Sequence, residues 1–503
     1  MFIIRGDIRT QQTLGAQAEV IVVDQDRVVY VGTHDAAKAK YGDDLETLDY
    51  GSNVVLPGLI DSHIHFLSYG LMRLKQVDLT AISTQTGLVD SLLCHATNTT
   101  GWIEGRGFDQ ERFDNNAWPT RRDLDKVSDS RPVIITRICG HAVVVNSVAI
   151  GMLSSTEQEK GNASTGLFTE TAIAAIKNCI PSPNETNLED AVLAAADVAL
   201  RQGITAVGTL LDTPAQFGAY IRLEQQTKLP VRMTGMPSWS SIDSLMMHGI
   251  RTGFGSNWTK VGGAKLFADG SLGARTARLS SPYEDAPGAL GDRIFTPHEL
   301  GRRAKIAAAA GFQIVIHAIG DQAVREALDA IIGTMTKGDG NPLRHRLEHV
   351  SLASPDIIND MADYGIIAAI QPQFVTSDPW TIDRVGPTRA KQAYPFQSLV
   401  NANIPIALGS DCPVEQLSSA ATIIAATRRA PWSPDEKLSL DQTLYAYTHG
   451  SAYSIFRDDI IGSLSPGKFA DFIVYNATYE GLEDQLEKGL LPAEVWVNGL
   501  RVR

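Results

Sequence analysis

The chain has 503 residues, of which 44% are hydrophobic and 20% charged, and its formal net charge is −13. A chain of this size and apolar content can bury a large core without disulfides or a partner chain, so a globular, enzyme-sized protein is expected. The acidic residues are scattered and Lys and Arg form no long run, which argues against nucleic acid as a partner.

The cysteines and the hydrophobic segments indicate the compartment. The four cysteines lie far apart and show no C-x-x-C spacing, which suits a reducing cytosol. The apolar run at the start of the chain, MFIIRGDIRT, is too short for the core of a signal peptide. No segment approaches the roughly 18 consecutive apolar residues of a membrane span. We therefore predict a cytoplasmic protein without a membrane segment.

Both ends of the chain are predicted to be β-rich. Residues 19–32, EVIVVDQDRVVYVG, read as two strands joined by a turn, and 462–477 and 493–502 again contain short β segments with turn residues. Residues 1–56 and 455–503 are therefore expected to form one small β-sandwich domain, with the rest of the chain inserted in it.

The middle of the chain alternates apolar strands with amphipathic helices. Strands are predicted at 261–268, 311–320, 365–373 and 404–411, and the segments between them carry apolar residues at three- and four-residue spacing. Repeated βα units predict an α/β fold in which residues 57–454 form a (β/α)8 TIM-like barrel. A doubly wound sheet is the alternative, but no G-x-G-x-x-G follows a strand. Residues 70–200 lose the alternation and are predicted to be an insertion that caps the barrel mouth.

Residues 54–66, VVLPGLIDSHIHF, form an apolar strand that ends in charge. His63 and His65 project to the same side if the chain stays extended. A lone histidine at a strand end is usually structural, but further ligand-type residues end other predicted strands, namely Lys265, His317, His349 and Asp411. Active sites of such barrels lie at the carboxyl ends of the strands, so the set predicts a metal centre.

The residue types suggest how metal would be held. His63, His65 and Asp411 would bind one ion, and His317 and His349 a second. Two neighbouring divalent cations repel each other, so a shared anion is needed between them. A lysine ammonium cannot bind metal, but a lysine that has reacted with carbon dioxide carries a carboxylate, and Lys265 lies where this could occur. A structural salt bridge is the other interpretation of Lys265.

Longer motifs carry a resemblance to a known family. PGLIDSHIHF, KLFADGSLGARTA, IHAIGDQAV, RLEHV and LGSDCPVE resemble the YtcJ-like branch of the amidohydrolase superfamily, which includes N-substituted formamide deformylases. The resemblance implies two divalent metal ions, zinc being the first choice, bridged by a Lys265 carbamate. It further implies that Asp411 is both a ligand and the general base, and that a homodimer is a possible assembly.

The expected reaction is hydrolysis of the C–N amide bond of a small N-acyl or N-formyl compound by metal-activated hydroxide. The resemblance implies an H-x-x-E motif after the fifth strand in the deaminase members of the superfamily. In this chain His317 is followed instead by Ala318, Ile319, Gly320 and Asp321. Two alternatives stay open: a mononuclear deaminase or cyclic-amide hydrolase, and a non-catalytic regulator or binding protein on the same fold.

Substrate contacts are predicted in the insertion and in the loop ADGSLGARTA. Aromatic residues are more often core residues, the loop could be a structural turn, and Arg275 could pair with a neighbouring acid instead of a substrate. Arg346 and Glu348, beside His349, are expected to orient metal ligands. The candidate substrate residues are Trp102, Phe108, Asp109, His141, Asp269, Ser271 and Arg275.

Overall fold

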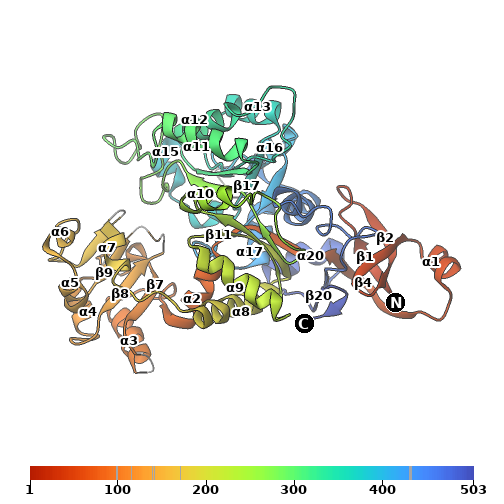
Figure 1. Ribbon diagram of the computed structural model, residues 1–503, viewed down its shortest axis with the longest axis horizontal. Helices are drawn as coiled ribbons and strands as arrows, with labels where there is room; N and C mark the ends of the chain where they lie inside the picture. Colours follow the sequence, from red (N-terminus) through yellow and green to blue (C-terminus); the bar gives the residue numbers. More distant parts are fainter. Residues whose placement is uncertain (98–99, 115, 139, 141, 170–171, 430–432) are drawn as a thin grey trace. The chain divides into compact units, whose positions relative to one another are not determined.

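The computed structural model describes residues 1–97, 100–114, 116–138, 140, 142–169, 172–429 and 433–503. The chain divides into two compact units (Figure 1). The first unit comprises Met1–Phe66 with Ala196–Arg503, and the second comprises Leu67–Ala195.

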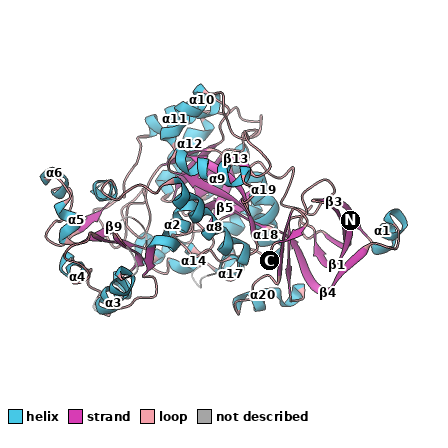
Figure 2. Cartoon of the chain, turned by 60° about the horizontal axis from the view of Figure 1, so that its bottom comes forward, coloured by secondary structure: helices cyan, strands magenta, loops and turns pink. Residues whose placement is uncertain are grey.

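The two ends of the chain share one sheet in the first unit. Among the described residues this sheet has seven strands, in the order β21-β20-β19-β4-β1-β2-β3, and only the β1–β4 pair is parallel. Figure 2 shows these strands close to both termini. Their bounds are Phe2–Arg9 (β1), Gln17–Asp24 (β2), Arg27–Gly32 (β3), Glu46–Pro57 (β4), Phe472–Tyr475 (β19), Glu494–Val497 (β20) and Leu500–Arg501 (β21).

Parallel strands form the rest of the first unit's sheet structure. They pair in the orders β13-β12-β11-β5 and β14-β15-β16-β17-β18. Most of their side chains are buried, as expected for parallel strands covered on both faces. The bounds are Leu59–Ile64 (β5), Ile204–Leu211 (β11), Arg232–Pro237 (β12), Thr259–Val261 (β13), Ala264–Phe267 (β14), Ile314–Ala318 (β15), Arg346–His349 (β16), Ile367–Ile370 (β17) and Ile406–Leu408 (β18).

The two sets of parallel strands also meet each other at both sides. A parallel bridge joins Ser238, directly after β12, to Lys265 in β14. At the other side, the Asp411 amide donates to the His63 carbonyl at 2.8 Å, and the His65 amide donates to the Cys412 carbonyl at 2.9 Å. The carboxyl end of β5 therefore lies beside the segment that follows β18.

Helices separate the parallel strands in sequence, and their caps agree with the sequence pattern. Helix α13 has Pro355 in its first turn and ends at Gly365, whose φ of 63° is the left-handed conformation common at helix ends. The helices of the first unit are α1 (His34–Tyr41), α9 (Pro214–Gln225), α10 (Trp239–Met247), α11 (Pro297–Ala309), α12 (Asp321–Ile332), α13 (Pro355–Tyr364), α14 (Phe374–Ser377), α15 (Thr381–Ala390), α16 (Phe396–Asn401), α17 (Ser419–Thr427), α18 (Leu440–Tyr445), α19 (Ser451–Ser454) and α20 (Tyr479–Glu487).

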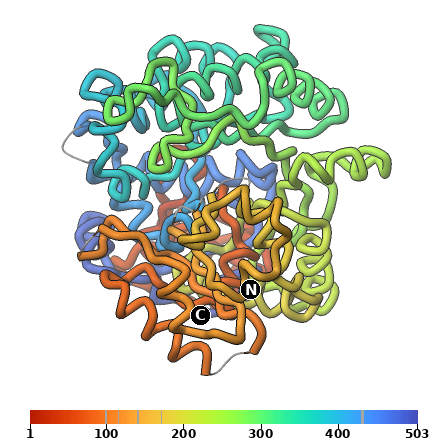
Figure 3. The backbone as a smooth tube through the Cα atoms, turned by 90° about the vertical axis from the view of Figure 1, so that its left-hand side faces the viewer, coloured from red at the N-terminus to blue at the C-terminus, as the bar shows by residue number. Residues whose placement is uncertain are grey.

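The second unit has its own sheet and core, and its backbone can be followed in the orange to yellow part of Figure 3. The strand order is β10-β9-β8-β7-β6, with β6 (Gln76–Asp78), β7 (Ile103–Phe108), β8 (Val133–Arg137), β9 (Ala142–Val145) and β10 (Leu167–Thr169). Its helices are α2 (Phe66–Lys75), α3 (Gln85–Ala96), α4 (Arg121–Asp125), α5 (Ser147–Gly151), α6 (Ser155–Gln158) and α7 (Ile173–Lys177), and α8 (Glu185–Arg201) leads back to the first unit.

The α/β class predicted from the sequence is confirmed. The predicted domain boundaries, the sandwich form of the terminal domain and the capping role of 70–200 stay predictions. Among the described residues, no helix combines the length and the apolar character needed to cross a membrane.

A buried ion pair fastens the terminal sheet to the parallel strands. Arg232, at the start of β12, donates to Asp471 through Nε at 2.7 Å and Nη2 at 3.1 Å, and both side chains are almost inaccessible to solvent. Asp471 also accepts from the Asn498 amide at 2.8 Å. Removing one partner of such a pair leaves a buried charge without compensation.

We therefore expect Asp471→Ala to lower the free energy of unfolding by about 3–5 kcal/mol. The matched control is Asp363→Ala, which removes the exposed Lys337–Asp363 pair and should cost less than about 1 kcal/mol. Urea unfolding followed by circular dichroism measures both values. Equal losses in the two variants would contradict the role given to the buried pair.

Candidate metal centre

The six predicted metal ligands lie at or near the carboxyl ends of parallel strands. His63 is in β5, Lys265 in β14 and His317 in β15, and His349 is the last residue of β16. In the strand register Phe267 pairs with His317 and Ala318 pairs with His349, so His317 and His349 lie at nearly the same level of neighbouring strands. His65 follows β5 and Asp411 follows β18.

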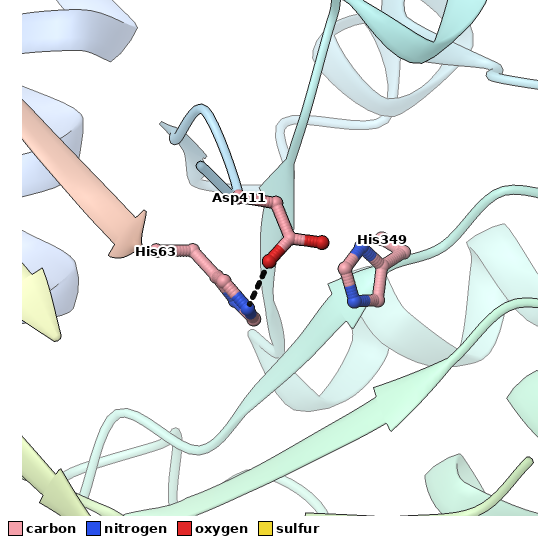
Figure 4. Close-up of side chains that lie close together, drawn as sticks. All are labelled: His63, His349 and Asp411. Carbon is pink, nitrogen blue, oxygen red and sulfur yellow. Dashed lines mark ion pairs between the residues drawn. The ribbon is translucent and has the colours of Figure 1, made fainter. Parts of the chain in front are cut away.

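Three of these residues form a buried cluster that could hold a metal ion. One ligand atom from each of His63, His349 and Asp411 lies within 4.8 Å of the other two. Figure 4 shows the three side chains pointing toward one another, with the His63 Nε2 to Asp411 Oδ1 distance at 3.3 Å. His65 Nε2 is also 3.3 Å from Asp411 Oδ1. Asp411 therefore lies beside both histidines of the HIH motif and close to His349.

His317 lies next to this cluster. Its ring centroid is 4.4 Å from that of His349, and the His349 ring is 5.1 Å from that of His63. The four histidines and Asp411 thus form one continuous group of nitrogen and oxygen donors, which is a set that divalent transition metals accept.

Hydrogen bonds define which ring nitrogen of His63, His349 and His317 is free to bind metal. His63 Nδ1 donates to Glu348 Oε2, His349 Nδ1 donates to Gln371 Oε1 at 2.6 Å, and His317 Nε2 donates to the Gly270 carbonyl at 3.0 Å. The nitrogen that remains on each ring is available as a ligand. Metal-binding histidines usually have a partner of this kind.

Burial and neighbouring charged groups set the protonation states of the cluster. Burial alone would raise the pKa of Asp411, but His63, His65 and His349 outweigh it and hold the pKa well below its usual range. Burial lowers the pKa of His349 to about 3, and burial with the neighbouring His349 lowers the pKa of His317 well below its usual value. Asp411 is therefore ionised and both imidazoles are neutral at pH 7, as metal binding requires.

Lys265 is buried in the same region. Its Nζ has no hydrogen-bonding partner among the described residues, and only 2% of the residue is exposed. Nζ lies 4.8 Å from the centroid of the Phe267 ring. Burial lowers the pKa of this amine to about 8, although Glu348 and Asp411 act in the opposite direction. Such a side chain is costly as an ammonium ion and suited to losing its proton.

Two of the candidate ligands have unusual backbone angles. His349 has a φ of 72° and Asp411 a φ of 57°, in the left-handed region that residues other than glycine rarely adopt. Each such residue costs on the order of 1 kcal/mol or more and persists where the surrounding structure imposes it. The strain at both positions is typical of a functional site.

The three predicted substrate residues of the 269–275 loop have partners within the protein. Asp269 is buried and accepts from the amides of Ile319, Gly320 and Arg278 at 3.1, 2.9 and 2.8 Å. Ser271 Oγ accepts from the Ala274 amide at 3.3 Å, and Arg275 pairs with Asp285 at 2.8 Å. These contacts match the structural-turn interpretation, and a substrate role for the loop stays a prediction.

The predicted substrate residues of the insertion belong to the second unit. Phe108 is fully buried and packs against Trp118, and Trp102 packs on a separate apolar cluster of that unit. Asp109 caps a short 3-10 helix at Gln110–Arg112 and pairs with Arg137 at 2.8 Å. His141 lies outside the described residues. Their contacts with a substrate stay predictions.

The sequence interpretation missed two buried polar residues of the site. Gln371, directly after β17, is the acceptor for His349. Asp61, in β5, accepts from the amides of His63 at 3.2 Å and Ser410 at 3.0 Å and so joins the ends of β5 and β18. Both could have been suspected, because each is a polar residue at or near the end of an apolar strand.

The fold and the donor cluster are those of an α/β metal-dependent hydrolase. Residues 46–503 match the amidohydrolase family, and the chain belongs to this family. It is 30% identical to the putative amidohydrolase YtcJ of Bacillus subtilis (93% of this chain, 93% of the relative) and 25% identical to the N-substituted formamide deformylase of Arthrobacter pascens (94% and 93%). An uncharacterized metal-dependent hydrolase from Pyrococcus furiosus has a similar structure, with a TM-score of 0.80, 31% identity, and 94% and 98% of the two chains covered. The predicted family is confirmed.

We expect Lys265→Met to stabilise the metal-free protein at pH 7 by on the order of 1–3 kcal/mol, because an apolar side chain replaces a buried amine without a hydrogen-bonding partner. The folded-state pKa of about 8 lies below the ordinary value of 10.5. The destabilising contribution of the protonated lysine is therefore at its full size below pH 8. The difference between variant and wild type should shrink from pH 8 to 10.5, where the unfolded chain loses the same proton.

Urea unfolding of chelator-treated protein at several pH values measures this difference. Lys260→Met is the control, since Lys260 donates to the Phe456 carbonyl at 3.1 Å and is not part of the donor cluster. A Lys265→Met variant that is less stable than wild type at pH 7 would contradict the prediction.

Proposed function

We propose that the protein is a binuclear metal-dependent hydrolase that cleaves the C–N bond of a small N-acyl or N-formyl amide. The observation that carries this proposal is the buried group of His63, His349 and Asp411, with His65, His317 and Lys265 at the neighbouring strand ends. The ionised carboxylate of Asp411 beside the neutral imidazoles of His349 and His317 is a donor set for divalent cations, and the chain has all six ligand positions.

We propose that the parallel strands close as a (β/α)8 barrel. Support comes from strands β5, β11, β12 and β14–β18 and from the bridge between Ser238 and Lys265. Further support comes from the backbone hydrogen bonds that join Asp411 to His63 and His65 to Cys412. A closed barrel would bring all strand ends to one rim, where the active sites of this architecture lie. The terminal sheet would then be the small β-sandwich domain of the fold.

The proposed centre holds two ions, with zinc as the first choice because imidazoles predominate. His63, His65 and Asp411 would hold one ion, and His317 and His349 the other. Lys265 would bridge them as a carbamate: its buried amine lacks a hydrogen-bonding partner among the described residues and has a pKa of about 8, so a fraction is neutral and can react with carbon dioxide.

When bound, divalent cations supply Lewis-acid chemistry, lowering the pKa of water to roughly 7 and polarising a carbonyl oxygen. Asp411 accepts the proton of the attacking water and then delivers it to the leaving nitrogen. Its position between His63 and His65 suits this role, since a general base must lie within hydrogen-bond reach of the proton it removes. The leaving nitrogen needs that proton because an amide anion is a poor leaving group.

The substrate class rests on two observations. The chain is similar over 94% of its length to an N-substituted formamide deformylase, and His317 is followed by Ala-Ile-Gly-Asp in place of the H-x-x-E of deaminase relatives. Both favour amide hydrolysis. We also propose that the protein is cytoplasmic and forms a homodimer.

We expect elemental analysis of protein purified with bicarbonate and without chelator to give two ions per chain. The same preparation should release amine from members of a panel of N-formyl and N-acyl amides. One ion with ammonia release from amino-substituted rings would favour the mononuclear deaminase instead. No metal after reconstitution, with no turnover of any amide, would favour the binding-protein alternative.

We expect Asp411→Asn to lower kcat about 10²–10⁴-fold on any amide that the wild type cleaves, because an amide is neither a base nor a good metal ligand. Asp363→Asn, at an exposed acid of α13, is the control and should keep wild-type kcat. Steady-state kinetics and circular dichroism measure rate and fold. Full activity in a folded Asp411→Asn variant would contradict the role of Asp411.

A further inference from the structure

Three histidines of the site, His63, His317 and His349, donate to acceptors of different charge. His63 donates to the carboxylate of Glu348, whereas His349 donates to the neutral amide oxygen of Gln371. His317 Nε2 donates to the backbone carbonyl of Gly270, and Asp269 Oδ1 lies farther from this nitrogen, at 3.6 Å. An ionised carboxylate, an amide oxygen and a carbonyl can only accept, so each pairing defines which ring nitrogen carries the proton.

The charge of the acceptor affects the strength of the metal ligand. A carboxylate attracts the Nδ1 proton of His63 and raises electron density on Nε2, which then binds a cation more strongly. A neutral amide oxygen attracts the Nδ1 proton of His349 less strongly, so it raises the electron density on Nε2 less. In metal sites, replacing such a partner changes metal affinity by about 10- to 100-fold.

The surroundings fix the charge of Glu348. Arg346 Nε donates to Glu348 Oε1 at 2.7 Å, and Arg346 is itself held by the Ser62 carbonyl at 2.9 Å and Ser454 Oγ at 3.1 Å. Arg346 and Glu348 are both fully buried, so solvent does not screen the carboxylate from His63.

The orientation of Gln371 is fixed as well. Its Nε2 donates to the Ala369 carbonyl at 3.2 Å, which turns Oε1 toward His349 Nδ1. Gln371 is buried, and it offers His349 a neutral acceptor at a distance suitable for a strong hydrogen bond.

We propose that Glu348 is a positioning residue that makes the metal position of His63 the tighter of the two, and that Gln371 keeps the position of His349 weaker. This inference rests on the proposed binuclear site. The first ion to bind occupies the His63 position, and the second exchanges more readily. The complete centre then forms as the free metal concentration approaches the weaker dissociation constant, so that activity depends on metal supply.

The test exchanges the two acceptors with side chains of the same shape. Metal-free wild type, E348Q and Q371E are titrated with zinc against a chromophoric chelator in bicarbonate buffer. Wild type should give two unequal dissociation constants. E348Q should weaken the tighter one by about 10- to 100-fold and leave the other unchanged, and Q371E should tighten the weaker one by a similar factor.

Folded E348Q with both constants unchanged, or with both weakened equally, would overturn the inference. If E348Q does not fold because Arg346 is left unpaired, Q371E decides: no tightening overturns the inference. A wild type that binds a single ion contradicts the binuclear proposal separately, and the effect of E348Q on that one constant still tests Glu348.

Discussion

The site depends on the compensation of charges that the parallel strands bury together. Arg346 donates to Glu348, Glu348 accepts from His63, and the other ring nitrogen of His63 lies next to Asp411. Cationic or donating groups therefore alternate with carboxylates along this chain of contacts. In a low-dielectric interior each group is tolerable only because its neighbours satisfy it. Lys265 lies in the same region, and its buried amine has no hydrogen-bonding partner among the described residues.

The backbone around the site is held as firmly as its side chains. Asp61 accepts from the amides of His63 and Ser410, and the Asp411 amide donates to the His63 carbonyl. These bonds join the end of β5 to the segment after β18, in which Asp411 has a left-handed φ. Metal ligands must be held close to their final geometry before the ion arrives, and hydrogen bonds among rigid strand ends provide this preorganisation.

Part of the fold and of the site could be predicted from the sequence because the signals are local. The alternation of apolar strands with amphipathic helices indicated the α/β class, and ligand-type residues at strand ends indicated the metal centre. The partners of the ligands could be predicted only in part: Glu348 was expected to orient a ligand because it lies beside His349, but its contact with His63, on another strand, was not expected. Gln371 and Asp61 were missed, because Gln371 contacts His349 and Asp61 contacts Ser410 across neighbouring strands. Phe108 was a candidate substrate residue, and the structure places it in the core of the second unit.

The sequence by itself determined the kind of chemistry: the HIH motif, Lys265, His317, His349 and Asp411 fix the donor types, because residue identity sets which atoms can bind a cation. Only the tertiary structure decided which nitrogen of each histidine is free, which acceptor faces it, and that Asp269 and Arg275 already have partners in the protein. The reason is physical: hydrogen bonds and burial depend on distances between strands, which neighbouring residues in the chain do not encode.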